Sequence, residues 1–192
     1  PDGRQIVFAS ETVDLPYSRT SRSQLFLVDL AGGVRRKITD ADAVQPKWSP
    51  SGQRIAFWGV VGGQRDLASV KTDGTDRVSI TNDAALDWAP EWSPDGRWIY
   101  FASDRGGAMA LWRIAVDDRT GRPSGAPESV TAGVESAMDL PSFSTDGRTL
   151  LFRSQTESSN PAAIPFDPAT ERAATPRVLT SRTGMLLPAS VS

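Results

Sequence analysis

The sequence predicts an all-β fold of short sheets that stack face to face, and three observations support that prediction. A segment of the form Gly-x-x-(Ile or Leu)-x-Phe occurs four times in the 192 residues. Its glycines lie 49, 44 and 51 residues apart, a period typical of repeat architectures. The apolar stretches between turn residues are four to six residues long and show no sustained helical period, as expected of strands.

Each copy of the segment opens on a predicted turn. In these turns proline presets φ for the second position, Asp or Ser takes the third, and glycine accepts the positive φ that follows. The pattern predicts a type I turn with a bulge, which suits a tight hairpin. Thr145 replaces the proline in the last copy, and a type I turn tolerates this. The four turns are Pro1–Arg4, Pro50–Gln53, Pro94–Arg97 and Thr145–Arg148.

The strand after each turn is apolar on both faces, as in Ile6–Ala9, Ile99–Ala102 and Leu150–Phe152. A strand that is covered on both faces belongs to a sheet stacked between two neighbours. The second copy contains four strand-like stretches, near residues 47–49, 54–58, 67–70 and 77–81. Four-stranded sheets repeated every 40 to 50 residues are the blades of a β-propeller. A β-sandwich would alternate more cleanly between apolar and polar residues.

We expect residues 1–192 to form a single array of about four four-stranded blades. Its repeats run approximately over residues 1–49, 50–93, 94–144 and 145–192. The first blade then lacks its first strand, and Pro165 and Pro168 predict a short or irregular third strand in the last blade. An excised part of a larger propeller is favoured over four blades that close on themselves, because the chain starts at a turn and stops in a stretch that resembles a spare first strand. The open end of such a part would expose an apolar blade face.

Composition excludes several classes of function. Lys and Arg total 21 against 23 for Asp and Glu, which leaves no basic footprint for nucleic acid. The chain has no cysteine and no histidine, so Ser-His-Asp triads, imidazole acid–base catalysis and Cys or His metal sites are absent. No apolar run approaches the roughly 18 residues that span a bilayer. We therefore expect no catalytic residue, no metal, no cofactor and no direct membrane insertion.

Two stretches resemble a known family of repeats. Gln45–Gly52 and Ala89–Gly96 are similar to the Pro-x-Trp-Ser-Pro-Asp-Gly signature of TolB-type, WD-repeat-like β-propellers. Arg97–Gly107 is similar to the strand and the Ser-Asp-Arg-Gly-Gly hairpin that follow that signature, and in the last copy Phe143 replaces the tryptophan. The resemblance implies a bacterial, non-enzymatic module that binds a protein or peptide through loops at the channel mouth. It also implies a periplasmic or extracytoplasmic location, with a cytoplasmic one left open.

Six residues are candidate binding residues: Gln45, Asp87, Trp88, Asp139, Tyr17 and Arg105. Gln45, Asp87 and Asp139 precede the prolines of successive entry loops, which border the channel on one face of a propeller. Such carboxylates could form a ring that binds a partner, and ordinary solvated loop polarity is the other interpretation.

The remaining candidates rest on loop position. Trp88 has no counterpart in the first and last copies, so a contact role is weighed against packing between blades. Arg105 stands at the Ser-Asp-Arg-Gly-Gly hairpin, and Tyr17 belongs to a long loop near residues 11–22. Long loops on rigid scaffolds often carry recognition.

Three other functions stay open. One is a substrate-gating propeller domain of a prolyl-oligopeptidase- or tricorn-like serine peptidase, with catalysis in a domain outside this chain. Another is the extracytoplasmic sensor of a bacterial kinase or regulator. A metal-dependent sugar lyase is disfavoured, because such sites usually recruit imidazole and this chain has no histidine.

Overall fold

The computed structural model describes residues 2–10, 23–131 and 137–155, together with short stretches between residues 162 and 179. The chain divides into two compact units, Pro1–Ser154 and Gln155–Ser192. Every regular element in the described residues is a β-strand, and the strand pairs whose register is described are antiparallel. The predicted all-β class is therefore confirmed.

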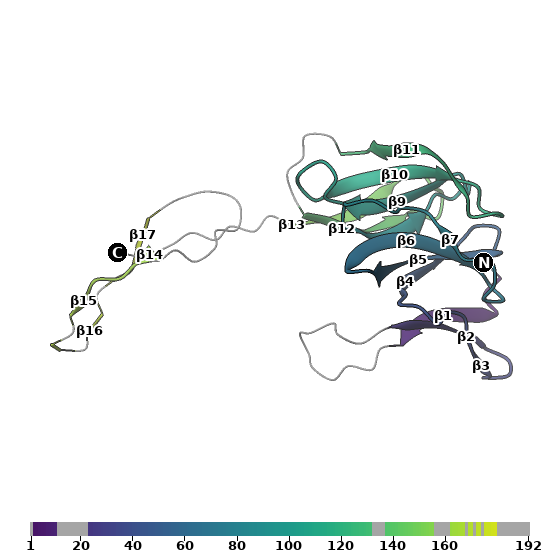
Figure 1. Cartoon of the computed structure of the whole chain (residues 1–192), viewed down its shortest axis with the longest axis horizontal. Coiled ribbons are helices and arrows are strands. Elements are labelled where there is room, and N and C mark those ends of the chain that lie inside the picture. The colour runs from purple at the N-terminus through teal and green to yellow at the C-terminus, as the bar shows by residue number, and fades with distance from the viewer. Residues whose placement is uncertain are drawn as a thin grey trace. The chain divides into compact units, whose positions relative to one another are not determined.

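The first unit consists of sheets in which strands that follow one another along the chain pair side by side (Figure 1). The second and third sheets have four strands each, as predicted, and the first has three. The sheets are β1 (Gln5–Ser10), β2 (Gln24–Asp29) and β3 (Arg35–Lys37); β4 (Val44–Trp48), β5 (Arg54–Val61), β6 (Gln64–Lys71) and β7 (Val78–Ser79); β8 (Asp87–Trp92), β9 (Trp98–Ser103), β10 (Ala110–Val116) and β11 (Pro123–Ser129); and β12 (Ala137–Phe143) and β13 (Leu150–Gln155).

The hydrophobic core lies between consecutive sheets, as expected of stacked blades. Leu25 of the first sheet packs in one cluster with Phe57 of the second. Leu67 of the second sheet packs in another cluster with Phe101 of the third. All four side chains are completely buried. Burial of one such side chain contributes about 1.5–3 kcal/mol, so these interfaces hold neighbouring sheets together.

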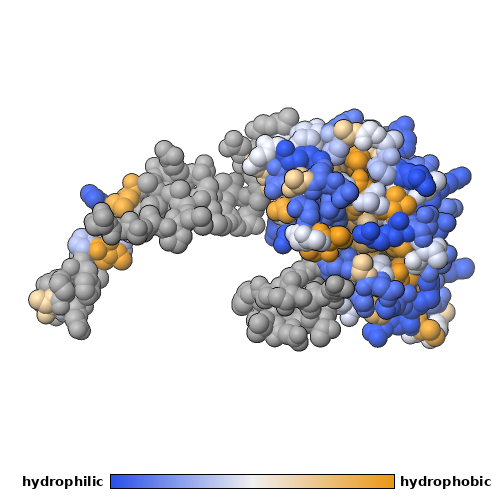
Figure 2. All heavy atoms as spheres, viewed as in Figure 1, coloured by the Kyte–Doolittle hydropathy of each residue, from blue (hydrophilic) through white to orange (hydrophobic). Residues whose placement is uncertain are grey.

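Apolar side chains are exposed on the outer sheets of this unit. In β1, Val7 packs toward the second sheet, whereas Ile6 on the opposite face is 48% exposed. Phe8 and Phe26 stack on that same face with ring centroids 5.8 Å apart. In β13, Leu151 is 66% exposed. Figure 2 shows hydrophilic residues over most of the visible surface of this unit, with hydrophobic residues gathered between them.

In the third and last copies, a serine without a predicted role holds the turn. Ser93 Oγ donates a hydrogen bond to Asp95 Oδ1 at 2.6 Å and accepts one from the Trp98 amide at 3.0 Å. Gly96 then adopts a φ of 71°, as predicted for this position. Ser144 makes the same two bonds in the last copy, at 2.6 and 3.0 Å. A single serine thus closes the hairpin and fixes the carboxylate beside it.

The second unit contains four two-residue strands: β14 (Ala162–Ala163), β15 (Phe166–Asp167), β16 (Arg172–Ala173) and β17 (Arg177–Val178). Phe166 pairs with Ala173, which reproduces the pairing of Val116 with Pro123 50 residues earlier in the chain. Pro165 separates β14 from β15, in line with the predicted irregular strand.

Candidate functional site

A pocket of about 340 Å³ lies where the first strands of three consecutive sheets, β4, β8 and β12, come together. These are the strands that line the channel of a propeller. Each contributes the proline of its repeat, and the residues on either side of that proline complete the wall. The lining residues are Gln45, Pro46, Lys47, Ala89, Pro90, Pro141 and Ser142.

The prolines of this pocket sit at bulges. The β4–β5 register shifts between Val44 and Lys47, and the β8–β9 register shifts at the equivalent place. The residues before the two prolines, Gln45 and Ala89, have positive φ angles of 49° and 52°. Proline lacks an N–H and is confined in sheets to edges and bulges, so the inner edges cannot readily recruit a further strand. The prolines therefore give the pocket a largely apolar wall that does not readily pair with another strand.

One ion pair crosses the wall of the pocket from β4 to β8. Lys47 Nζ lies 2.5 Å from Glu91 Oε2, and the side chains are 43% and 18% exposed respectively. Burial raises the pKa of Glu91, and the Lys47 ammonium partly offsets that shift. Ser142 takes the same repeat position in β12 and is exposed. The exposed charge of this pair is consequently the ammonium group.

Gln45 faces this pocket with a defined amide orientation. The Trp58 indole N–H donates a hydrogen bond to Gln45 Oε1 at 2.6 Å. Because an indole N–H is only a donor, the amide oxygen must face Trp58 and the NH₂ group lies on the other side. Among the sequence-predicted site residues whose side chains the structure describes, Gln45 is the one that lines the pocket.

Trp88 lies on β8, half-buried against the core between the second and third sheets. The Arg65 guanidinium stands 5.2 Å from its ring centroid and 5.4 Å from the ring of Trp58. One arginine thus bridges aromatic side chains of two sheets, which favours the packing interpretation of Trp88 while leaving part of its surface exposed.

Asp87 and Arg105 are turned into the protein. Asp87 is completely buried, and Arg105 Nη2 donates to its two carboxylate oxygens at 2.9 and 2.8 Å. Arg105 also donates from Nη1 to Asp83 at 3.1 Å and from Nε to Ser103 Oγ at 2.9 Å. Burial raises the pKa of Asp87, although hydrogen bonds from Ser103 and Arg105 oppose the shift. The pair organises the loop between β7 and β8.

The expected ring of equivalent entry-loop residues does not follow the repeat. Gln45 stands directly before Pro46 and corresponds to Ala89, whereas Asp87 lies three residues before Pro90. Asp139 lies on β12, but its side chain is outside the described residues, as is the whole of Tyr17. The sequence argument missed Lys47 and Glu91, although both directly follow the repeat proline, a signal that could have identified them.

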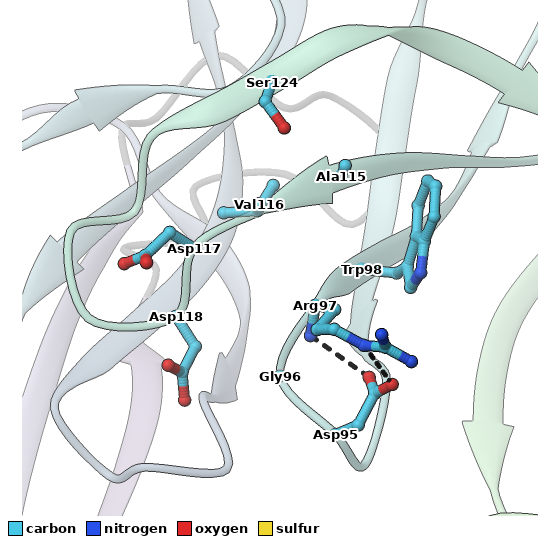
Figure 3. Close-up of a pocket in the computed structure, with 9 residues that line it drawn as sticks. All are labelled: Asp95, Gly96, Arg97, Trp98, Ala115, Val116, Asp117, Asp118 and Ser124. Atoms are coloured by element: carbon cyan, nitrogen blue, oxygen red, sulfur yellow. Dashed lines mark hydrogen bonds and ion pairs between the residues drawn. The ribbon is translucent and has the colours of Figure 1, made fainter.

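A second hollow, of about 420 Å³, lies beside the turn between β8 and β9 (Figure 3). Three aspartates rim it, and a hydrogen bond engages each of them, within the same loop for Asp95 and Asp117 and from the turn of the second sheet for Asp118. Asp95 accepts from Arg97, Asp117 Oδ1 accepts from the Thr120 amide at 2.8 Å, and Asp118 Oδ2 accepts from the Ser51 amide at 3.1 Å. These carboxylates hold their turns, and this hollow carries no binding assignment.

The described part of the chain offers neither a metal cluster nor a membrane-spanning helix. No group of three or more His, Cys, Asp or Glu residues there is arranged to hold a metal ion. No helix there has the length and apolar character needed to cross a membrane.

Comparison with known proteins matches residues 1–183 to a family model described as the TolB beta propeller domain. An uncharacterized protein of Agrobacterium fabrum is 34% identical over 97 residues, which cover 50% of this chain and 33% of that protein. Dipeptidyl-peptidase 5 of Porphyromonas endodontalis is 33% identical over 108 residues, which cover 54% of this chain and 15% of that protein. The chain therefore spans a third or less of these relatives.

Solved structures agree on the fold. A putative TolB from Agrobacterium tumefaciens superposes with a TM-score of 0.69 at 24% identity, covering 94% of this chain and 62% of the other. TolB from Acinetobacter baumannii gives a TM-score of 0.63 at 22% identity, covering 93% of this chain and 41% of the other. These likenesses confirm the predicted propeller segment.

Proposed function

Because this chain belongs to the TolB β-propeller family, we propose that it is a non-enzymatic module that binds a segment of a protein or peptide. The segment binds on the channel side, in the pocket formed by β4, β8 and β12. A periplasmic or extracytoplasmic location is part of the proposal, since it accompanies the TolB likeness.

The inner-strand pocket is the observation that supports this function. Its walls come from three strands whose sheets pack against one another: buried Leu67 and Phe101 join the sheets of β4 and β8. Tyr100 of the third sheet contacts Phe143 of β12 with ring centroids 5.1 Å apart. A preformed concave surface lowers the ordering cost of binding. Mostly apolar walls with a few polar groups that fix orientation are typical of ligand sites.

The candidate residues take different roles in this proposal. Gln45 contacts the bound segment together with Lys47, because both line the pocket. Trp88 contributes its exposed part to the neighbouring rim. Asp87 and Arg105 keep the loop before β8 in place. Asp139 and Tyr17 remain proposed contacts at the mouth.

Selection of random dodecapeptides displayed on phage tests this function. We expect the immobilised chain to enrich peptides, and we expect Ser142→Trp to abolish their binding by filling the pocket with an indole. Ser124→Trp is the matched control, because Ser124 is also exposed but lines the other hollow. Failure to enrich any peptide, or equal loss in both variants, would contradict the proposal.

The match to dipeptidyl-peptidase 5 favours a second candidate function. In it the propeller segment admits peptides to a peptidase domain encoded outside residues 1–192. The sequence of the complete gene tests this, since a hydrolase domain must be present. In such a protein, Ser142→Trp would slow cleavage of long peptides more than of dipeptide substrates.

A further inference from the structure

We propose that the inner-strand pocket recognises a carboxylate, so that the segment bound there is acidic. This inference rests on the proposed function and specifies its ligand. It is based on three polar groups that line one apolar pocket: the Lys47 ammonium, the Gln45 amide and the Ser142 hydroxyl.

The Lys47 ammonium is the charged group that a ligand can reach. An ammonium has three N–H donors. Its partner in the ion pair, the Glu91 carboxylate, is on a side chain that is only 18% exposed. Lys47 itself is 43% exposed and lines the pocket, so it can donate to an incoming acceptor while keeping its partner. Glu91 has little exposed surface to offer a basic ligand.

Gln45 adds a donor through its fixed orientation. Its oxygen accepts from the Trp58 indole at 2.6 Å, which assigns the NH₂ group to the opposite side of the amide. Ser142, from a third strand, brings an exposed hydroxyl to the same pocket. The polar side chains at the surface of the pocket are thus donors or can act as donors.

The apolar walls of the pocket favour a ligand whose carboxylate is attached to an apolar stem. Pro46, Pro90 and Pro141 contribute rings that offer no N–H to a ligand. An aspartate or glutamate of an extended segment can place its methylene stem on these rings and its carboxylate against Lys47. Hydrogen bonds between ionised partners are about twice as strong as neutral ones, so a carboxylate is favoured over an amide of the same shape.

A charge swap tests the inference with the fold held constant. Lys47→Glu with Glu91→Lys keeps an ion pair between the same two strands but reverses the more exposed charge. We expect dodecapeptide selection on the unaltered chain to enrich Asp and Glu, and selection on the swapped chain to enrich Lys and Arg. Calorimetry should show the best acidic peptide binding about tenfold more tightly than its Asn or Gln analogue. That ratio should fall to near one in Lys47→Met.

The outcomes separate this inference from the proposed function. Peptides that compete with one another, are blocked by Ser142→Trp and yet carry no acidic preference would overturn carboxylate recognition alone. Identical peptides selected by the swapped and unaltered chains would overturn it as well. Absence of any pocket-dependent peptide would overturn the binding function itself. Circular dichroism and the unfolding midpoint of each variant confirm that the comparison is made on folded protein.

Discussion

The Arg105 guanidinium contacts both oxygens of the Asp87 carboxylate, at 2.9 and 2.8 Å, with Asp87 completely buried. The same guanidinium lies 5.4 Å from the ring centroid of Phe101 and 5.5 Å from that of Trp112. The pair therefore anchors the start of β8 to the hairpin that follows β9. The Ser-Asp-Arg-Gly-Gly sequence acquires a structural explanation in this contact.

We expect Asp87→Ala to lower the free energy of unfolding by about 3–5 kcal/mol, because it leaves a largely buried guanidinium without its main partner. Urea titration followed by tryptophan fluorescence measures the change. Arg105→Ala should cost a similar amount, and the double variant should cost less than the sum of the two.

Lys37→Ala is the control for that prediction. Lys37 pairs with Asp40 at 2.5 Å, but the side chains are 47% and 88% exposed. Exposed pairs contribute about 0–1 kcal/mol. A loss at Asp87 no larger than the loss at Lys37 would show that the buried pair does not anchor β8.

Gly121→Ala should destabilise the protein more than Gly125→Ala does, by about 1–3 kcal/mol. Both glycines have positive φ, 69° and 78°, so the backbone strain of an alanine is shared. A Cβ at Gly121 would lie 2.2 Å from Ser69 Oγ and 2.3 Å from Arg54 Nε of the second sheet, whereas a Cβ at Gly125 meets nothing within 4 Å. Equal unfolding midpoints would show that the loop at Gly121 does not press against the second sheet.

Much of the fold could be predicted because the repeat encodes it locally. The turn at Ser93–Gly96 and the strand that follows it depend on neighbouring residues, and both were predicted. The contact between the loop at Gly121 and the buried Arg54 could not be, since it joins segments about 67 residues apart. The division of residues 145–192 as a fourth repeat remains a proposal, supported by the register that Phe166 shares with Val116.

Phe57→Ala and Phe101→Ala should each lower the free energy of unfolding by about 3–5 kcal/mol, the usual cost of deleting a buried phenylalanine. Both side chains are 0% exposed and lie between sheets. Leu151→Ala is the matched control, because Leu151 is 66% exposed, and it should cost about 0.5 kcal/mol or less. A loss below about 1 kcal/mol for either phenylalanine would contradict stacked sheets.

The carboxyl group of Asp95 should have an unusually low pKa. The hydrogen bond from Ser93 Oγ, helped by Arg97, lowers its pKa to about 2. A lowered folded-state pKa stabilises the fold above the unfolded value of about 3.9, and that contribution is lost as the pH falls toward 2. Carbon-detected NMR titration should show the pKa of Asp95 rising in Ser93→Ala. An unchanged value would mean that Ser93 does not hold this carboxylate.

The candidate site was less predictable than the fold. Gln45 was found because it precedes a repeat proline, and the structure places it in the pocket. The burial of Asp87 depends on Arg105, 18 residues away along the chain, and loop polarity alone could not indicate it. Lys47 and Glu91 each follow the proline of their copy, which marks them as inner-strand residues, but that position alone does not show that they pair across β4 and β8.

Cross-linking between β4 and β8 tests the central claim, that inner strands of successive sheets face one channel. The chain has no cysteine, so Lys47→Cys with Glu91→Cys introduces only two thiols. We expect a short bismaleimide to join them within one chain, giving one linker per protein and no free thiol. The control pairs Lys47→Cys with Glu128→Cys, since Glu128 lies on β11 at the far edge of the third sheet. Equal intramolecular cross-linking in the two pairs would contradict the account.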